Sequence, residues 1–295
     1  MTTNASLGQH MDEELRSQPD VWQRAVTQAG SENLLPASGA RVAVVGCGTS
    51  WFMAESYAAA RETVGHAVAG GLPGRGYDAV VAITRSGTTS EVLTLLKELE
   101  PGITTIALVG DTSSPIVEMV DRVVELPYAD EQSVVQTRFA TTALAYLLSS
   151  VGMDLGEAIE QARTAVDQET GTDLLEAEQF TFLGQGWSVG LAHEAALKMR
   201  EAVQGWTEAY PAMDYRHGPI AIAAPGRVTW SFGPAPEGLA ADVERTGALY
   251  VESSRHPLAE LARLHRVTLD RARHRGLDPD APRNLSRSVI LEEQA

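Results

Sequence analysis

Two short segments of the chain combine glycine with hydroxyl side chains, a composition that suits phosphate binding. Residues 46–50 are Gly-Cys-Gly-Thr-Ser, and residues 84–89 are Thr-Arg-Ser-Gly-Thr-Thr. Glycine allows tight turns, and hydroxyl groups beside the free N–H groups of a helix start can hold an anion. Each segment follows a predicted strand, and ligands of open α/β sheets bind at the carboxyl ends of strands. We therefore expect the two loops to converge on one anion.

Each segment also has a purely structural interpretation. Residues 46–50 suit an ordinary strand-to-helix turn, because they lack the third glycine of a dinucleotide-binding fingerprint and the Gly-Lys-Ser/Thr of a P-loop. Ser-Gly-Thr in the second segment is a good helix N-cap sequence. The two loops together favour phosphate binding more than either does alone. Arg85 adds a cation that favours an anionic ligand.

A long predicted helix, residues 187–206, carries a stripe of polar side chains. At about 100° per residue, one face holds Glu194, Lys198, Glu201, Gly205 and Glu208. The stripe has two interpretations. It is either a solvent-exposed face with a Glu194–Lys198 ion pair, or the lining of a cleft that holds a carboxylate and an ammonium group. Only two of the 23 basic residues are lysines. The use of lysine at position 198 favours the cleft.

One histidine stands out after this helix. His217 lies in the sequence Arg-His-Gly-Pro, residues 216–219. A lone histidine is more often structural than catalytic. The Gly-Pro pair nevertheless predicts a fixed turn that would hold the imidazole at a loop tip.

Composition excludes several classes of partner. The net charge of −16 argues against nucleic acid, whose phosphates require clustered Lys and Arg. A single cysteine, Cys47, cannot form an intramolecular disulfide and suits a reducing compartment. The polar start shows no signal peptide, and no apolar run reaches the roughly 18 residues of a membrane span. No His/Cys cluster has the spacing of metal ligands, so we expect no metal, and we expect no other cofactor. Together these features predict a cytoplasmic protein that does not contact a membrane.

The elements that must position these residues alternate between strand and helix. Predicted strands cover residues 41–45, 78–83, 104–109, 122–126, 179–183, 227–232 and 248–251, and predicted helices cover 51–61, 90–99, 133–150, 155–166, 187–206 and 257–275. This alternation predicts an α/β fold with two doubly wound parallel-sheet domains in tandem. We place an N-terminal arm at 1–30, the domains at 31–152 and 153–281, and a C-terminal tail at 282–295.

In this order, the motifs resemble those of the sugar isomerase (SIS) domain family, in particular the isomerase portion of glucosamine-6-phosphate synthase. The matching segments run from residue 11 to residue 292 and are 11–19, 46–50, 86–89, 194–201, 208–210, 217–219 and 282–289. The resemblance implies two flavodoxin-like SIS domains. It also implies a homodimer whose active site borrows a histidine from the neighbouring subunit.

The resemblance further assigns roles to individual residues. It implies that the substrate phosphate is held by Ser50, Thr84, Arg85, Ser86 and Thr89, and that further substrate contacts come from Thr49, Gln136, Thr137 and Arg287. It implies that Glu201 is the base that moves a proton between C1 and C2 of the sugar. Lys198 would lie near the substrate oxygens, and His217 would assist ring opening. These residue types suit aldose–ketose interconversion.

Departures from the family pattern limit the expected chemistry. The chain starts with Met1 and its only cysteine lies in the phosphate loop, so we expect no glutamine hydrolysis. Arg287 stands where the family has a lysine, and arginine stays protonated and cannot form a Schiff base, although it can ion-pair. The second domain is also shorter. Stand-alone amino-sugar-phosphate deaminases, phosphoketose isomerases and fructosamine-phosphate deglycases are therefore the nearer relatives.

The expected function is a phosphosugar isomerase or deaminase of carbohydrate metabolism. Its substrate would be an amino-sugar or ketose 6-phosphate. The alternative is a non-catalytic phosphosugar sensor. Such regulators carry a DNA-binding helix-turn-helix before the sugar domain, and the forty residues before the first predicted strand leave little room for one. Glu201, Lys198 and His217 together favour the enzyme.

Overall fold

The computed structural model describes residues 7–61, 65–68, 72 and 74–291. Contacts divide the chain into two compact units. Unit 1 comprises Met1–Pro19, Gln132–Thr137 and Gly156–Leu285, and unit 2 comprises Asp20–Glu131, Arg138–Leu155 and Ser286–Ala295. The units interleave along the sequence, whereas the predicted domains are continuous segments. Within the described residues, no helix is long and apolar enough to cross a membrane.

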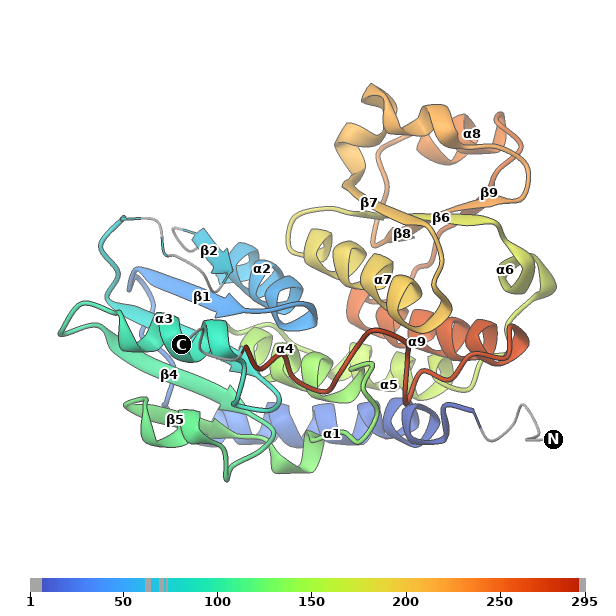
Figure 1. The fold of residues 1–295 in the computed structure, drawn as a ribbon. Helices are drawn as coiled ribbons and strands as arrows, with labels where there is room; N and C mark the ends of the chain where they lie inside the picture. Colours follow the sequence, from blue (N-terminus) through green and yellow to red (C-terminus); the bar gives the residue numbers. More distant parts are fainter. Residues whose placement is uncertain (1–6, 62–64, 69–71, 73, 292–295) are drawn as a thin grey trace. The chain divides into compact units, whose positions relative to one another are not determined.

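Unit 2 contains a five-stranded sheet in which all neighbouring strands are parallel (Figure 1). Its strands are β1 (Val42–Gly46), β2 (Gly65–Val68), β3 (Ala79–Thr84), β4 (Thr104–Val109) and β5 (Arg122–Glu125), in the order β2-β1-β3-β4-β5. The strand order reverses beside β1, so the loops after β1 and β3 leave the sheet at neighbouring positions. This is where parallel sheets bind ligands.

Helices explain why β1 and β3 are buried along their whole length. The helices of unit 2 are α2 (Thr49–Arg61), α3 (Ser90–Lys97), α4 (Arg138–Ser150), the 3-10 turns η2 (Pro115–Glu118) and η3 (Pro127–Ala129), and the second part of α1 (Gln9–Ser31). Val92 and Leu95 of α3 pack on Val45 and Val80 of the sheet. Strands covered on both faces carry continuous apolar runs, which is the pattern that made them predictable.

Unit 1 contains a four-stranded parallel sheet. Its strands are β6 (Gln179–Gly184), β7 (Thr207–Pro211), β8 (Arg227–Phe232) and β9 (Leu249–Val251), in the order β7-β6-β8-β9. Its helices are α5 (Gly156–Ala165), α6 (Thr172–Glu176), α7 (Ser188–Val203), α8 (Leu239–Glu244), α9 (Pro257–His274) and the first part of α1, with the 3-10 turns η4 (Ala212–His217) and η5 (Pro219–Ile222). The predicted α/β class with parallel sheets is confirmed.

Two local predictions were wrong. Helix α7 ends at Val203 because Gln204 adopts a left-handed conformation with φ of 55°, so Gly205 and Glu208 are not on the helix face and Glu208 lies on β7. Helix α4 begins only at Arg138, which leaves Gln136 and Thr137 in the preceding loop. The predicted N-terminal arm contains the 23-residue helix α1. Strands β2 and β7 were not predicted.

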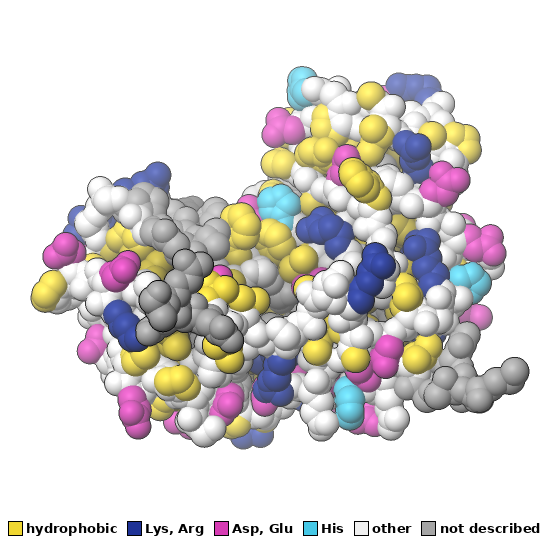
Figure 2. Space-filling model, viewed as in Figure 1, with side chains coloured by type: hydrophobic (Ala, Val, Ile, Leu, Met, Phe, Trp, Pro, Cys, Tyr) yellow, Lys and Arg dark blue, Asp and Glu magenta, His cyan; other side chains and the backbone are white. Residues whose placement is uncertain are grey.

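Charges of both signs are mixed on the face of the molecule that Figure 2 shows. Over the described part of the chain, acidic and basic side chains are interspersed on this face.

Several arginines are buried in unit 1. Those at positions 263, 266 and 271 of α9 donate hydrogen bonds to backbone carbonyls of residues 166–177. They fix the connection between α5 and β6 onto α9.

Candidate functional site

The loop after β3 is held in a fixed shape by its own backbone. Gly87 has a φ of +61°, and its amide donates to Thr84 Oγ1 at 3.1 Å. The amides of Gly110 and Asp111, after β4, both donate to the carbonyl of Arg85 at 3.1 and 2.9 Å. Two strand ends are thereby connected, and the side chains of residues 84–89 are presented on a rigid loop.

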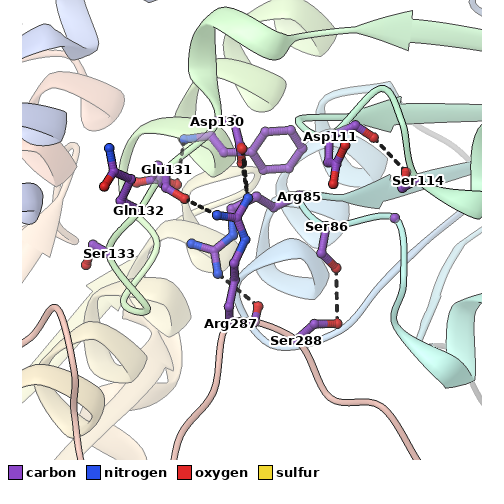
Figure 3. Close-up of polar contacts among 12 residues, drawn as sticks. Arg85, Ser86, Asp111, Ser114, Asp130, Glu131, Gln132, Ser133, Arg287 and Ser288 are labelled. Atoms are coloured by element: carbon purple, nitrogen blue, oxygen red, sulfur yellow. Dashed lines mark hydrogen bonds and ion pairs between the residues drawn. The ribbon is translucent and has the colours of Figure 1, made fainter.

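Three hydroxyl groups meet at this loop, and one of them comes from the C-terminal tail. Ser86 Oγ and Ser288 Oγ are 3.1 Å apart (Figure 3). Thr88 Oγ1 lies 3.0 Å from each of them. Ser86 is buried, while Thr88 and Ser288 are half-buried. The hydroxyl groups therefore sit at the edge of the loop, where an anion from solvent can reach them.

The loop after β1 contributes the other predicted hydroxyls. Thr49 and Ser50 are buried in the first turn of α2. A Cβ on Gly46 would lie 2.8 Å from the backbone carbon of Ser50, so only glycine fits there. Thr89 stands immediately before α3 as its N-cap, and its side chain makes no capping hydrogen bond. All five predicted phosphate-binding residues thus lie at the carboxyl ends of β1 and β3 in unit 2.

Arg287 anchors the tail to unit 2. Its Nη2 donates to both carboxylate oxygens of Asp130, at 2.6 and 2.7 Å, and its Nη1 donates to the carbonyl of Glu131 at 2.7 Å. Arg85 Nη2 donates to the carbonyl of Arg287 at 2.9 Å (Figure 3). Bidentate arginine–carboxylate pairs fix geometry as well as charge. The guanidinium predicted to contact substrate is therefore part of a tail anchor.

Two more acidic residues lie around these arginines. Glu131 is buried, and its carboxylate accepts from the amides of Arg138 at 2.7 Å and Phe139 at 3.0 Å, which caps the start of α4. The pKa of Asp111 is lowered, first by the hydroxyl and then by the amide of Ser113, and also by the charge of Arg287. Asp111 therefore stays ionised beside the arginine pair.

Helix α7 of unit 1 carries a buried ion cluster. Lys198 Nζ contacts a carboxylate oxygen of Glu201 and lies 3.5 Å from Glu194 Oε1. The side chains of Lys198 and Glu194 are 0% and 1% exposed, whereas that of Glu201 is 19% exposed. The helix face predicted as a stripe is thus a buried cluster in which Glu201 alone remains accessible. The i,i+3 and i,i+4 spacing explains why the three charges meet.

A neutral histidine lies close to this cluster. His265 of α9 is fully buried, and its Nδ1 is 3.2 Å from Nε2 of Gln18 in α1. Burial lowers the pKa of His265 to about 3, and the positive charge of Lys198 contributes to the shift. His265 is therefore uncharged at neutral pH.

The remaining predicted residues lie apart from these contacts. His217 is exposed at the end of η4 and is followed by Gly218 with a φ of 141°. Gln136 and Thr137 lie in the loop before α4 and belong to unit 1, with Thr137 fully buried. The predicted catalytic residues are thus in unit 1, and the predicted phosphate loops are in unit 2.

No family model matches the sequence. Curated relatives include the glutamine–fructose-6-phosphate aminotransferases of Synechocystis, 26% identical over an alignment of 323 positions, and of Sulfurisphaera tokodaii, 28% identical over 251. These alignments cover 85% and 73% of this chain but 51% and 43% of the relatives. The chain thus spans about half the length of the curated relatives it matches.

Solved structures show the same fold. A glucosamine-6-phosphate deaminase from Thermotoga maritima matches with a TM-score of 0.75 and 22% identity, covering 96% of this chain and 98% of that one. The tagatose-6-phosphate ketose/aldose isomerase of Escherichia coli matches with a TM-score of 0.77 and 16% identity, covering 100% and 99%. The chain is thus similar in sequence to glutamine–fructose-6-phosphate aminotransferases and similar in fold to phosphosugar isomerases and a deaminase.

Several residues of the site were not predicted. Ser288 and its partner Thr88 both lie inside the motifs that the sequence analysis identified. Their hydroxyl groups and their positions could therefore have marked them as candidate site residues. Asp130 and His265 gave no such signal, because each acts through a contact with a distant part of the chain. A pocket of about 760 Å³ also opens between α3, residues 72 and 74–77, and Leu291, and none of the predicted site residues lines it.

Proposed function

We propose that this protein is an enzyme that moves a proton between C1 and C2 of an amino-sugar or ketose 6-phosphate, as an isomerase or a deaminase. The observation that carries the proposal is the cluster on α7, in which an accessible carboxylate, Glu201, contacts a fully buried ammonium group. The names of the relatives support the substrate class, since they include fructose, glucosamine and tagatose 6-phosphates.

Glu201 is the proposed base. Aldose–ketose interconversion removes a proton from one of the two carbons, passes through an enediol and returns a proton to the other carbon, while a hydroxyl proton moves between the oxygens of C1 and C2. One carboxylate serves both steps, so it ends as it began. The ammonium group of Lys198 would donate to the substrate oxygens and stabilise the negative charge that develops on them. Glu194 is buried 3.5 Å from this ammonium group.

The hydroxyl loops of unit 2 are the proposed phosphate site. Ser50, Ser86 and Thr89 would donate to the phosphoryl oxygens, and Arg85 would supply positive charge. Thr84 already accepts a hydrogen bond from the Gly87 amide, so it also shapes the loop. His217 would assist ring opening from the neighbouring subunit of a homodimer. Neither reaction requires a metal or another cofactor.

Replacing Glu201 by glutamine tests the enzyme assignment. Glutamine keeps the shape and the hydrogen bonds but cannot accept the proton, so turnover should fall by roughly 10²–10⁴-fold while binding is kept. Deuterium exchange from solvent into C1 or C2 is the readout, with glucosamine, glucose, fructose, galactosamine and tagatose 6-phosphates as substrates. Ammonia release distinguishes deamination from isomerisation. Exchange that survives in Glu201→Gln would assign the base to another residue; Glu194, the second candidate by sequence, is disfavoured because it is 1% exposed.

The alternative is a phosphosugar sensor. Tight binding of a sugar phosphate by the wild-type protein, without exchange at C1 or C2 in any of the five substrates, would support the sensor. The phosphate loops favour both functions equally. Only the α7 cluster favours the enzyme, because a sensor does not require a base beside a cation.

A further inference from the structure

The C-terminal tail is fastened to the same loop that is proposed to hold the phosphate. Besides the Arg85–Arg287 contact, the amide of Ser90 donates to the carbonyl of Val289 at 3.3 Å, and the amide of Leu291 donates to Ser90 Oγ at 2.9 Å. Every one of these contacts joins residues 287–291 to residues 85–90. The tail therefore forms one wall of the loop.

The three hydroxyl groups at this wall form a closed set. Each of Ser86, Thr88 and Ser288 lies within 3.1 Å of the other two. A hydroxyl has one donor, and its hydrogen rotates to suit its surroundings. A phosphoryl group offers several acceptor oxygens, so all three hydroxyls can turn from one another to an anion without any change in protonation. The set is a preformed triple donor.

We propose that Ser288 is a ligand of the bound phosphoryl group, together with Ser86 and Thr88, and that the Arg287–Asp130 ion pair holds the tail in place for it. The proposal deepens the proposed function, on which it rests for the nature of the anion. It explains an arginine at position 287, where a long, always charged, bidentate side chain reaches a carboxylate 157 residues away in sequence. Binding of the anion and docking of the tail are then linked, since each event stabilises the other.

The opposite arrangement is a plug. If the tail merely occupied the loop, an anion would have to displace it, and loosening the tail would tighten anion binding. The two arrangements therefore give opposite signs for the same substitutions. Inorganic phosphate and fructose 6-phosphate are suitable probes for calorimetric titration, because both carry the phosphoryl group and neither measurement needs turnover.

Removal of the tail hydroxyl is the first test. Ser288→Ala should weaken binding of both probes by about tenfold or more, because hydrogen bonds to a charged group are among the stronger ones. Thr88→Val should act in the same direction. Ser286→Ala is the matched control, since among the described residues its hydroxyl bonds only to the carbonyl of Ser288, and it should leave affinity within about twofold. Tighter or unchanged binding in Ser288→Ala overturns the proposal.

Breaking the anchor is the second test. Asp130→Asn keeps the shape but removes the charge that holds Arg287, so amide hydrogen exchange of residues 288–291 should accelerate and phosphate affinity should fall. Adding Ser288→Ala to Asp130→Asn should then cost much less than it does in the wild type. In the wild type, phosphate should slow exchange in the tail. Faster exchange on phosphate addition indicates a plug and rejects the proposal.

The outcomes separate this inference from the proposed function. Phosphate binding that depends on Ser288, without deuterium exchange into any sugar phosphate, keeps the tail ligand and removes the enzyme. Turnover with no effect of Ser288→Ala keeps the enzyme and removes the tail ligand. Wild-type protein that binds neither inorganic phosphate nor fructose 6-phosphate overturns the inference.

Discussion

Position 87 illustrates how one residue controls the shape of the phosphate loop. Its φ is +61°, and a Cβ there would lie 1.9 Å from the Oγ of Ser114. Gly87→Ala should therefore lower the free energy of unfolding by about 2 kcal/mol or more, combining backbone strain with overpacking, and should weaken phosphate binding. Gly48→Ala is the control, since its φ is +56° but nothing lies within 4 Å, and about 1 kcal/mol is expected. Equal losses in urea denaturation would contradict the loop geometry.

Lys198 is expected to matter for stability as well as for chemistry. Lys198→Met removes the ammonium group that lies between two carboxylates, one of which, Glu194, is 1% exposed. Breaking a buried ion pair from one side commonly costs about 3–5 kcal/mol. The double variant Glu194→Gln/Lys198→Met should recover much of that loss in urea denaturation. A single variant as stable as the wild type would show that the cluster contributes little.

Residue types in the site could be predicted from sequence, but their partners could not. The hydroxyl loops and the Glu194–Lys198–Glu201 spacing follow from local sequence, because strand ends and helical periodicity fix where such side chains point. The partner of Arg287 does not, since Asp130 lies 157 residues away and neither residue has a local pattern that indicates pairing. Long-range pairs are set by the packed fold.

Between helices, the burial of His265 makes stability depend on pH. The pKa of His265 is about 3 in the folded protein against an ordinary value of 6.5, so the unfolded chain takes up a proton that the folded chain does not. The resulting stability is fully present above about pH 6.5 and is lost as pH falls toward 3, at up to about 1.4 kcal/mol per pH unit.

His265→Gln tests this linkage. Glutamine can still bond to Gln18 but does not titrate, so its unfolding free energy should fall less steeply than that of the wild type between pH 6.5 and pH 4.5. Urea denaturation at several pH values in this range measures both slopes. Parallel slopes would show that His265 titrates alike in the folded and unfolded chains.

Among the elements, the buried strands were predicted best. Continuous β-branched runs such as residues 42–45 and 79–83 are typical of parallel strands that helices cover on both faces. Helix α1 was missed because Pro19 interrupts its pattern and its surface is mostly polar. The end of α7 was placed three residues late because a left-handed Gln204, rather than a glycine, stops the helix.

Considered as a whole molecule, the two parallel sheets are not equivalent as ligand sites. In unit 1 the position at the end of β6 that corresponds to the phosphate loop is occupied by Ser188. Its hydroxyl accepts from the amide of Gln185 at 2.9 Å and donates to the carbonyl of Phe232 at 2.7 Å. The hydroxyl is thus used to join β6 to β8. We therefore propose different roles for the similar sheets, with the proposed anion site in unit 2 and the charged α7 cluster in unit 1.

The homodimer implied by the resemblance is the prediction that concerns the whole molecule. Trp206 is 79% exposed and Met213 is 61% exposed, and both lie in the segment that leads to His217. Single exposed apolar residues are common on protein surfaces. A tryptophan as exposed as Trp206, directly before β7, nevertheless favours an interface with a partner that would bury it. If that segment meets a second copy of the chain, His217 would be carried to the neighbouring subunit.

Sedimentation velocity at micromolar concentration tests the dimer directly. The wild-type protein should sediment as a dimer, and Trp206→Ser/Met213→Ser should shift it toward monomer while the melting temperature of a dilute sample changes little. Ile290→Ser is the matched control, because Ile290 is 68% exposed but lies on the tail of unit 2, and it should leave the dimer intact.

Mixing His217→Ala with Glu201→Gln is a stricter test of the shared active site. If the active site is shared, mixing the two inactive variants should restore part of the activity, since one of the two sites in a mixed dimer has both residues. A wild-type monomer, or mixed variants that stay inactive while exchanging subunits, would remove the basis for a shared site and leave His217 without a role in catalysis.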